Sequence, residues 1–347
     1  MSEKGVFKKL LNKNIKFLPL NGGNSGTNPF IPLNINSLIP GTQSPCSLYI
    51  KAQIAAEQEI KFVPYTKEGD SLEEESLALL ESLGIRWLYF SNHDLEKVIA
   101  YLNNCLLILS GDDLGQVKIR LTLLTEHLQL TLRQSLHAPR LGPHVRAAHH
   151  QIGRIIQELQ KDKQALGLIW EVLTTSYNLY THSANVCLLA VAMMLFMQKG
   201  VPDSQHVGLA ALFHDVGMTR LPQEIFFKTS PLTQEEWYMV KHHPEIGQRL
   251  LRDCPILPLW GLRLILEHHE NADGSGYPQG LPLKRQHRWT CLLRVADAYD
   301  SLTHNNLYRP NRTPFAALKE MKQQQGPRGP VFDPQTLDNF IRFLGNS

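Results

Sequence analysis

The chain has 347 residues, of which 43% are hydrophobic, and its formal net charge is +3. This length is sufficient for two domains with buried cores, while so mild a charge argues against binding to a nucleic-acid polymer. The five cysteines are scattered and odd in number, which argues against a disulfide framework and favours a reducing, cytoplasmic compartment.

The N-terminal part begins with residues 1–27, which are polar, rich in glycine and predicted to form a flexible arm. Residues 28–110 follow as a predicted small α+β domain of regulatory type, without residues that suggest catalysis. Its pattern predicts strands over 47–52, 59–65 and 85–90 and helices over 72–83 and 94–109. Ser71 and Glu74 form the signature of a capping box for the first helix, and Gly84 ends it.

Residues 111–141 are predicted to contain a connecting helix, because residues 112–136 lack proline and carry apolar side chains at helical spacing. This helix could also pair two copies of the chain in a homodimer. Pro139 and the Gly142-Pro143 pair then interrupt the pattern.

Residues 142–347 are predicted to form an all-α domain, in which helical patterning is interrupted by proline and glycine turns. The longest apolar run, 184–197, is shorter than a membrane span and is predicted to be a buried helix. We expect no membrane span and no signal peptide, since lysines break up the first residues of the chain.

Seven of the 15 histidines lie between His182 and His269, several in adjacent pairs. They fall in or beside predicted helices over 165–199, 204–213, 233 onward and 262–270, the third starting with a capping box of Thr233 and Glu236; a helix over 287–302 carries Asp297 and Asp300. A lone histidine is usually a core or surface residue, but several buried imidazoles in one place need common partners. Imidazoles and carboxylates are preferred ligands of iron, manganese and zinc, so the sequence predicts a hydrolytic metal site.

The segment from His268 to Leu281, HHENADGSGYPQGL, resembles the signature of the HD-GYP family of metal-dependent phosphohydrolases. The resemblance covers about residues 171–318 and includes His214-Asp215-Val216-Gly217, His243-Pro244 and Ala296-Asp297-Ala298-Tyr299-Asp300. It implies a mainly α protein, with an all-helical HD-GYP domain after a small α+β domain. Members of this family hydrolyse cyclic di-GMP, and some hydrolyse related cyclic dinucleotides.

The resemblance also implies the metal ligands. One metal would be bound by His182, His214, Asp215 and Asp297, and the other by Asp215, His243, His268 and His269. Asp215 would bridge two divalent transition metals, iron or manganese, that activate water for attack on phosphorus. Of His242 and His243, the second is chosen because proline follows it.

The loop after the paired histidines implies further roles. Gly274, Gly276 and Pro278 would let it fold tightly beside the metals, with Tyr277 presented to substrate, although the pattern also fits a merely rigid turn. Asp273 would hold a ligand histidine. Arg309, after Asp297, would remain as a cation that faces a phosphate.

Three positions depart from the family pattern. Asn178 stands one turn before His182, where members with a third metal have glutamate, so two metals are expected. Met218 and Asn306 each replace a cation that faces a substrate phosphate, and the sequence does not show that the nearby Arg220 points inward to compensate.

Three interpretations of the sequence follow. The first is a dinuclear phosphodiesterase that converts cyclic di-GMP, or a relative, to linear dinucleotide or GMP. The second, favoured by Met218 and Asn306, is a weakly active or inactive receptor or scaffold that binds metal, nucleotide or a signalling partner. The third, a deoxynucleotide phosphohydrolase, is disfavoured by the signature loop.

Overall fold

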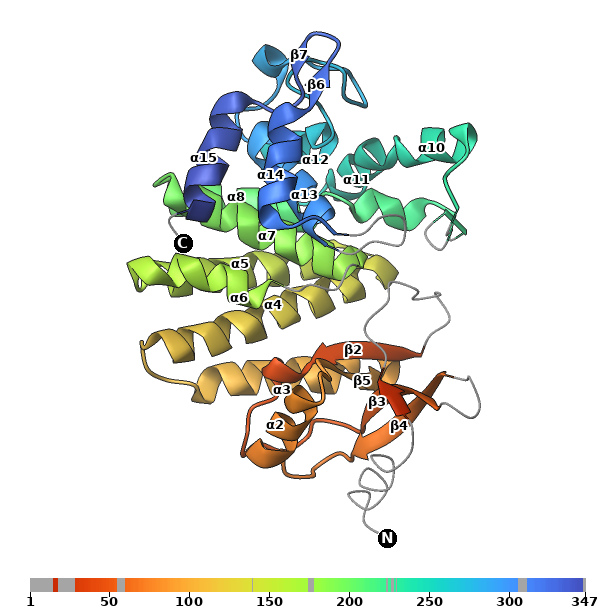
Figure 1. Cartoon of the computed structure of the whole chain (residues 1–347), viewed down its shortest axis with the longest axis vertical. Coiled ribbons are helices and arrows are strands. Elements are labelled where there is room, and N and C mark those ends of the chain that lie inside the picture. Colours follow the sequence, from red (N-terminus) through yellow and green to blue (C-terminus); the bar gives the residue numbers. More distant parts are fainter. Residues whose placement is uncertain are drawn as a thin grey trace. The chain divides into compact units, whose positions relative to one another are not determined.

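The computed structural model of the chain describes residues 15–17, 29–54, 60–138, 140–173, 178–222, 224–225, 228, 230–304 and 311–345. The chain divides into two compact units (Figure 1). Unit 1 comprises Met1–Gly111 with Thr122–His127, and unit 2 comprises Asp112–Leu121 with Leu128–Ser347. Helix α4 (Leu114–His137), within the predicted connecting segment, therefore contributes to both units.

Unit 1 is a small α+β unit. Its elements are β1 (Ile15–Phe17), β2 (Phe30–Asn34), η1 (Ile35–Ser37), β3 (Leu48–Ile54), β4 (Ile60–Thr66), α2 (Glu74–Ser82), β5 (Trp87–Ser91), η2 (Asn92–Asp94) and α3 (Leu95–Ile108). The strands form one sheet in the order β1-β3-β5-β2, with β4 paired to β3. These strand pairings are all antiparallel.

Two sequence-based expectations for this unit were wrong. The predicted arm contains β1, which pairs with β3, and the rest of that arm lies outside the described residues. Helix α2 begins after Glu73, whose side chain makes no capping hydrogen bond, and Ser71 instead forms a β-bridge with Gln43. Gly84 does end the helix as expected, with a φ of 73° that favours glycine.

Unit 2 is almost entirely helical. Besides α4 it contains α5 (Gly142–Gln160), η3 (Lys163–Leu168), α6 (Ile169–Val172), α7 (Leu179–Phe196), α8 (Val201–Leu212), η4 (Val216–Arg220), α10 (Gln234–Val240), α11 (His243–Leu251), α12 (Leu259–Glu267), η5 (Leu283–Arg285), α13 (Thr290–Thr303), α14 (Pro314–Gln323) and α15 (Pro334–Gly345). A short hairpin of β6 (Gln325–Gly326) and β7 (Gly329–Pro330) is an exception to the predicted all-α domain.

Helix α7 forms the centre of unit 2 and packs against α5, α6, α8, α13 and α15. It is long and apolar enough to cross a membrane, but 78% of its apolar window is buried inside the protein. The apolar run is therefore a core helix, as expected from its length.

The histidine-bearing helices differ in their boundaries from those predicted. The predicted helix over 165–199 is interrupted, and the described part that carries His182 is α7. The capping box of Thr233 and Glu236 is present, but α10 ends at Val240, and His243 opens a separate helix, α11. Helix α12 ends at Glu267, so His268 and His269 follow it rather than lie within it.

A close backbone contact joins η4 to α11. A Cβ atom added to Gly217 would overlap with the carbonyl oxygen of His243 and approach the backbone nitrogen of Gly247. Only glycine permits this approach. It fixes His243 beside the turn that carries Asp215.

Candidate metal centre

Seven side chains from five segments of unit 2 form a group that we call the His–Asp cluster. Its members are His182 from α7, His214 and Asp215 from the turn after α8, His243 from α11, His268 and His269 from the turn after α12, and Asp297 from α13. The possible ligand atoms of Asp215, His243, His268 and His269 all lie within 4.8 Å of one another, as do those of His182, His214 and Asp215.

Asp215 belongs to both groups, and its two oxygens face different histidines. Oδ1 lies 3.1 Å from Nε2 of His243 and 3.6 Å from Nε2 of His268. Oδ2 lies 3.3 Å from Nε2 of His214 and 3.8 Å from Nε2 of His182. Asp297 is the second carboxylate, with Oδ1 3.3 Å from Nε2 of His182.

The backbone fixes the protonation of three of these imidazoles. Nδ1 of His214, His243 and His268 lies 2.6–2.7 Å from the carbonyl oxygens of Ala211, Val240 and Ile265, respectively. Because a carbonyl can only accept, each Nδ1 carries the proton, and in the neutral ring Nε2 is a bare lone pair.

These lone pairs point at each other. Nε2 of His243 lies 3.0 Å from Nε2 of His268, so two nitrogens that cannot donate are in contact. Nε2 of His214 is buried and makes no hydrogen bond with any residue that the structure describes. Cations bound beside these atoms would satisfy all three nitrogens, so the donor set fits divalent metals.

The charges of the cluster suit metal binding as well. Burial lowers the pKa of His268 to about 4 and that of His269 well below its usual range, so both rings are neutral near pH 7. Burial opposes ionisation of Asp215, but the neighbouring His214 holds its pKa well below the usual range. Neutral imidazoles and ionised carboxylates are the forms that bind metal.

Asp300 positions His182. Its Oδ2 accepts a hydrogen bond from Nδ1 of His182 at 2.7 Å, and its Oδ1 accepts from Nδ2 of Asn185 at 2.9 Å. Nδ1 of His304 lies 3.0 Å from the same Oδ1. No role was predicted for Asp300, although its spacing of three from Asp297 on one helix places both carboxylates on neighbouring positions of one face.

The loop from Asn271 to Leu281 is held by Glu270, another residue for which no role was predicted. Its buried carboxylate accepts hydrogen bonds from the backbone N–H groups of Gln279 and Leu281 at 2.7 and 2.8 Å. A Cβ atom on Gly276 would overlap with the backbone near His269, so the loop folds tightly there, as predicted. Gly274 has a φ of 77°, and the Tyr277–Pro278 peptide is cis.

The role predicted for Asp273 was wrong. Its Oδ1 accepts hydrogen bonds from the backbone nitrogen and hydroxyl of Ser275, at 3.0 and 2.7 Å, and so closes a local turn. The carboxylate that holds a cluster histidine is that of Asp300. Aspartate side chains readily bond nearby backbone groups, and Ser275 rather than a cluster histidine is the partner of Asp273 Oδ1.

Tyr277 and Arg294 lie beside the cluster. The ring centroid of Tyr277 is 4.7 Å from that of His269 and 6.5 Å from that of His243. Nη1 of Arg294 is 3.8 Å from Oδ2 of Asp297, and its Nε donates to Oδ1 of Asn271 at 3.3 Å. Arg294 therefore brings positive charge to the cluster, a contribution that was not predicted from the sequence.

The remaining predicted residues lie apart from the cluster or outside the described chain. His242 contacts Tyr238 through a hydrogen bond from Nδ1 to its carbonyl oxygen. Asn178 caps α7, with Oδ1 accepting from the backbone nitrogens of Tyr180 and Thr181. Met218 is half-buried in η4 and Arg220 is exposed at its end, whereas Asn306 and Arg309 lie outside the described residues.

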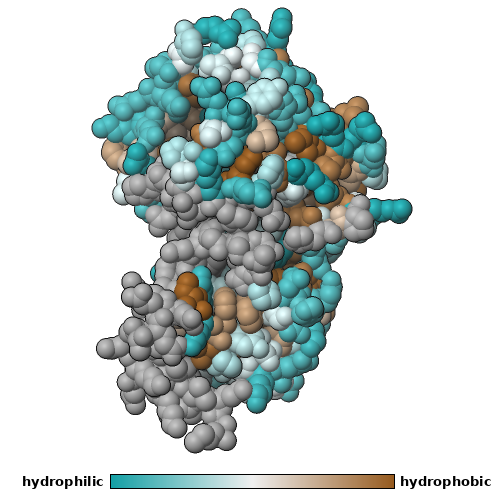
Figure 2. Space-filling model, turned by 90° about the vertical axis from the view of Figure 1, so that its right-hand side faces the viewer, coloured by the Kyte–Doolittle hydropathy of each residue, from teal (hydrophilic) through white to brown (hydrophobic). Residues whose placement is uncertain are grey.

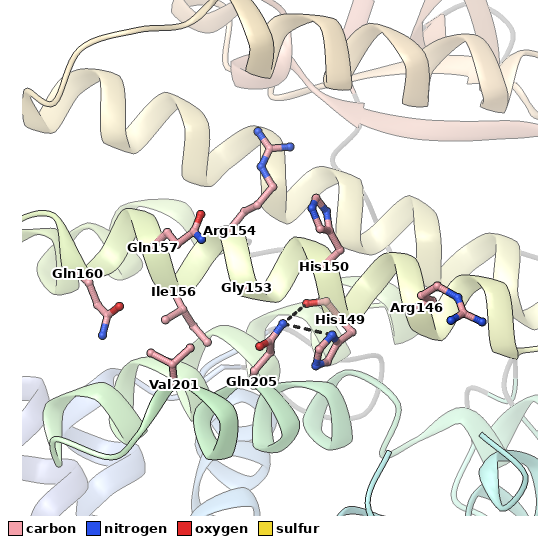
Figure 3. Close-up of a pocket in the computed structure, with 10 residues that line it drawn as sticks. All are labelled: Arg146, His149, His150, Gly153, Arg154, Ile156, Gln157, Gln160, Val201 and Gln205. Carbon is pink, nitrogen blue, oxygen red and sulfur yellow. Dashed lines mark hydrogen bonds between the residues drawn. The ribbon is translucent and has the colours of Figure 1, made fainter. Parts of the chain in front are cut away.

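A separate hollow of about 540 Å³ lies between α5 and α8 (Figure 3). Arg146 and Arg154 line it, and Gln205 donates to the carbonyl oxygen of His149 at its floor. The described residues that line it include neither a carboxylate nor a thiol. The hollow is thus less suited to hydrolytic chemistry than the His–Asp cluster.

Comparison with known proteins places the cluster in a family context. Residues 168–335 match the family model described as HD domain. The chain is 30% identical over 208 residues to a cyclic di-GMP phosphodiesterase of Pseudomonas aeruginosa, covering 59% of this chain and 49% of that protein. It is 34% identical over 160 residues to the cyclic di-GMP phosphodiesterase response regulator of Xanthomonas campestris, covering 44% and 40%.

The chain thus spans no more than about half the length of these two relatives. A solved structure described as an HDG"Y"P protein from Bdellovibrio bacteriovorus shares the fold, with a TM-score of 0.67 at 19% identity. The match covers 91% of this chain and 99% of that one.

Proposed function

We propose that the chain is a metal-dependent phosphodiesterase of the HD-GYP family, since residues 168–335 match the family model described as HD domain. Its substrate is cyclic di-GMP or a related cyclic dinucleotide, and its product is the linear dinucleotide or GMP. The names of the relatives support this substrate class. The observation that carries the proposal is the set of bare Nε2 atoms that converge on the two oxygens of Asp215.

We assign two divalent metals to the cluster. His182, His214, Asp215 and Asp297 would hold one, and Asp215, His243, His268 and His269 would hold the other, so that Asp215 would serve both. The separate histidines faced by its two oxygens support this division. The side-chain oxygen of Asn178 already accepts hydrogen bonds as the N-cap of α7, which argues against a third metal there. Nitrogen and oxygen donors together favour iron or manganese.

When bound, such a pair of cations supplies Lewis-acid activation of water and of a phosphoryl oxygen. The residues of the chain orient and shield this chemistry. Asp300 fixes the ring of His182, and Glu270 holds the loop that places Tyr277 over His269. Arg294 supplies charge complementary to a phosphodiester beside Asp297.

A second candidate function is that of a receptor or scaffold which binds a cyclic dinucleotide with little turnover. The apolar side chain of Met218 favours it, because this half-buried residue follows Asp215 by three positions and brings no charge to a phosphate. In that role a signalling protein would be the partner, and the signal would reach the HD domain through the N-terminal α+β unit.

We further propose that the protein acts in the cytoplasm, where its five buried free cysteines would remain reduced. Pairing of two copies through α4 would give a homodimer. Neither a nucleic-acid polymer nor a membrane is needed for the proposed activity.

Two substitutions test the proposed function. We expect Asp215→Ala to lose metal and to abolish hydrolysis of cyclic di-GMP, because this carboxylate serves both metals. Tyr277→Ala should keep its metal and change only the handling of substrate, because this ring contacts the ligands and not the ions. Elemental analysis and product chromatography of both variants give the comparison. An Asp215→Ala protein that retained both metals would refute the bridging assignment.

A further inference from the structure

Helix α10 exposes three consecutive large side chains close to the His–Asp cluster. Trp237, Tyr238 and Met239 are 46%, 63% and 37% exposed. Hydrophobic residues also gather among hydrophilic ones on the face of unit 2 shown in Figure 2, which is the side on which α10 lies in Figure 1. A single exposed apolar residue needs no explanation, but three in a row on so short a helix suggest a binding surface.

The two aromatic rings of this helix have different neighbours. Successive residues of a helix point in different directions. The ring of Tyr238 packs on His242, which is not a member of the cluster, with centroids 4.5 Å apart. The ring of Trp237 contacts Tyr277 at 6.2 Å in an edge arrangement with an interplanar angle of 76°.

Trp237 is thereby linked to the cluster by a continuous series of rings. Tyr277, its neighbour, lies 4.7 Å from the ring of His269, a proposed metal ligand. An edge contact covers at most one face of an indole, and the exposure of Trp237 leaves ring surface open to solvent. The exposed ring of Trp237 is thus connected through Tyr277 to His269, beside which a phosphodiester would react.

We propose that Trp237 is the stacking platform for a purine base of the cyclic dinucleotide, and hence a residue that determines specificity. The inference rests on the proposed function and names the part of that site which binds the base. Bases stack on aromatic side chains through their π faces, and each such contact contributes about 1–3 kcal/mol. The connection from Trp237 through Tyr277 to His269 favours a base over a protein partner. A base that stacks on Trp237 is linked through its own sugar to the phosphate that reacts at the cluster.

The test compares Trp237→Ala and Trp237→Phe with Tyr238→Ala, a matched loss of an exposed ring from the same helix. The full chain is loaded with manganese, and kcat, KM and metal content are measured with cyclic di-GMP. We expect Trp237→Ala to raise KM about fivefold or more, with kcat and metal content unchanged. Phenylalanine should restore most of the affinity, and Tyr238→Ala should behave as the wild type.

If the wild type hydrolyses cyclic di-GMP and Trp237→Ala has the same KM, the stacking role of Trp237 is refuted. The proposed function is then unaffected. An equal rise of KM in Tyr238→Ala would also overturn the platform, because it would indicate a general surface for a partner. If the wild type binds without turnover, calorimetric affinities replace KM with the same expectations. A wild type that neither binds nor hydrolyses cyclic di-GMP or 3'3'-cGAMP, the substrate named for two other relatives, would overturn both proposals.

Discussion

At the scale of single residues, Asp300 shows how a carboxylate outside the cluster can control it. It is completely buried and surrounded by His182, Asn185 and His304. Its hydrogen bond to Nδ1 of His182 fixes the tautomer in which Nε2 faces Asp215 and Asp297. Such partners of ligand histidines also raise the basicity of the ring.

We therefore expect Asp300→Asn to weaken metal binding about 10- to 100-fold while the fold is retained. The amide keeps the shape of the carboxylate but loses the charge that holds His182. Asp203→Asn is the matched control, since Asp203 pairs with Arg288 at the surface. Metal affinity by chelator competition and circular dichroism give the readout. Equal affinities in the two variants would show that Asp300 does not position His182 for metal.

At the scale of elements, the contact between η4 and α11 decides whether His243 reaches Asp215. In Gly217→Ala, the added methyl group would overlap with the backbone of His243, which cannot move without moving α11. We expect the free energy of unfolding to fall by about 1–3 kcal/mol, together with metal affinity. Urea denaturation measures the free energy of unfolding. Gly142→Ala is the control, because no other atom lies within 4 Å of a Cβ added there. Similar losses in both variants would contradict the proposed role of this backbone contact.

Helix α4 makes stability depend on pH through Glu126. Burial raises the pKa of Glu126 from 4.5 to about 8, against a hydrogen bond with the backbone of Asn34. As pH rises, the Glu126 carboxyl ionises at a lower pH in the unfolded chain than in the folded one. The free energy of unfolding therefore falls between about pH 4.5 and 8, by about 1.4 kcal/mol per pH unit. Glu126→Gln should therefore become more stable relative to the wild type from pH 5 to pH 8. Urea denaturation at pH 5 and pH 8 measures this, with the exposed Glu81→Gln as control. If Glu126 were ionised in the folded state at both pH values, the difference in free energy of unfolding between Glu126→Gln and the wild type would be the same at both.

The sequence predicted the long elements better than the short ones. Helices with clear apolar periodicity, such as α3 and α4, lie within about two residues of their predicted bounds. β1 was missed because its three residues become a strand only by pairing with β3. The end of α10 at Val240 was missed because capping signals mark where a helix starts more clearly than where it stops.

At the scale of the whole molecule, unit 2 contains every member of the His–Asp cluster. The resemblance to the HD-GYP signature was sufficient to predict which histidines and aspartates converge. Contacts between distant segments were not predictable in this way. Asp300 and His182 are 118 residues apart, and Arg294 reaches Asn271 across 23 residues. Supporting residues have no local signature, because their partners are defined only by the fold.

A dinuclear centre that hydrolyses a cyclic dinucleotide can be tested in a single preparation. The wild-type chain is loaded with manganese under anaerobic conditions, its metal content is determined, and the same sample is incubated with cyclic di-GMP. We predict about two metal ions per chain and conversion of cyclic di-GMP to linear dinucleotide. Three firmly bound ions would contradict the role of Asn178, and binding of cyclic di-GMP without turnover at full metal content would contradict the enzyme and favour the receptor.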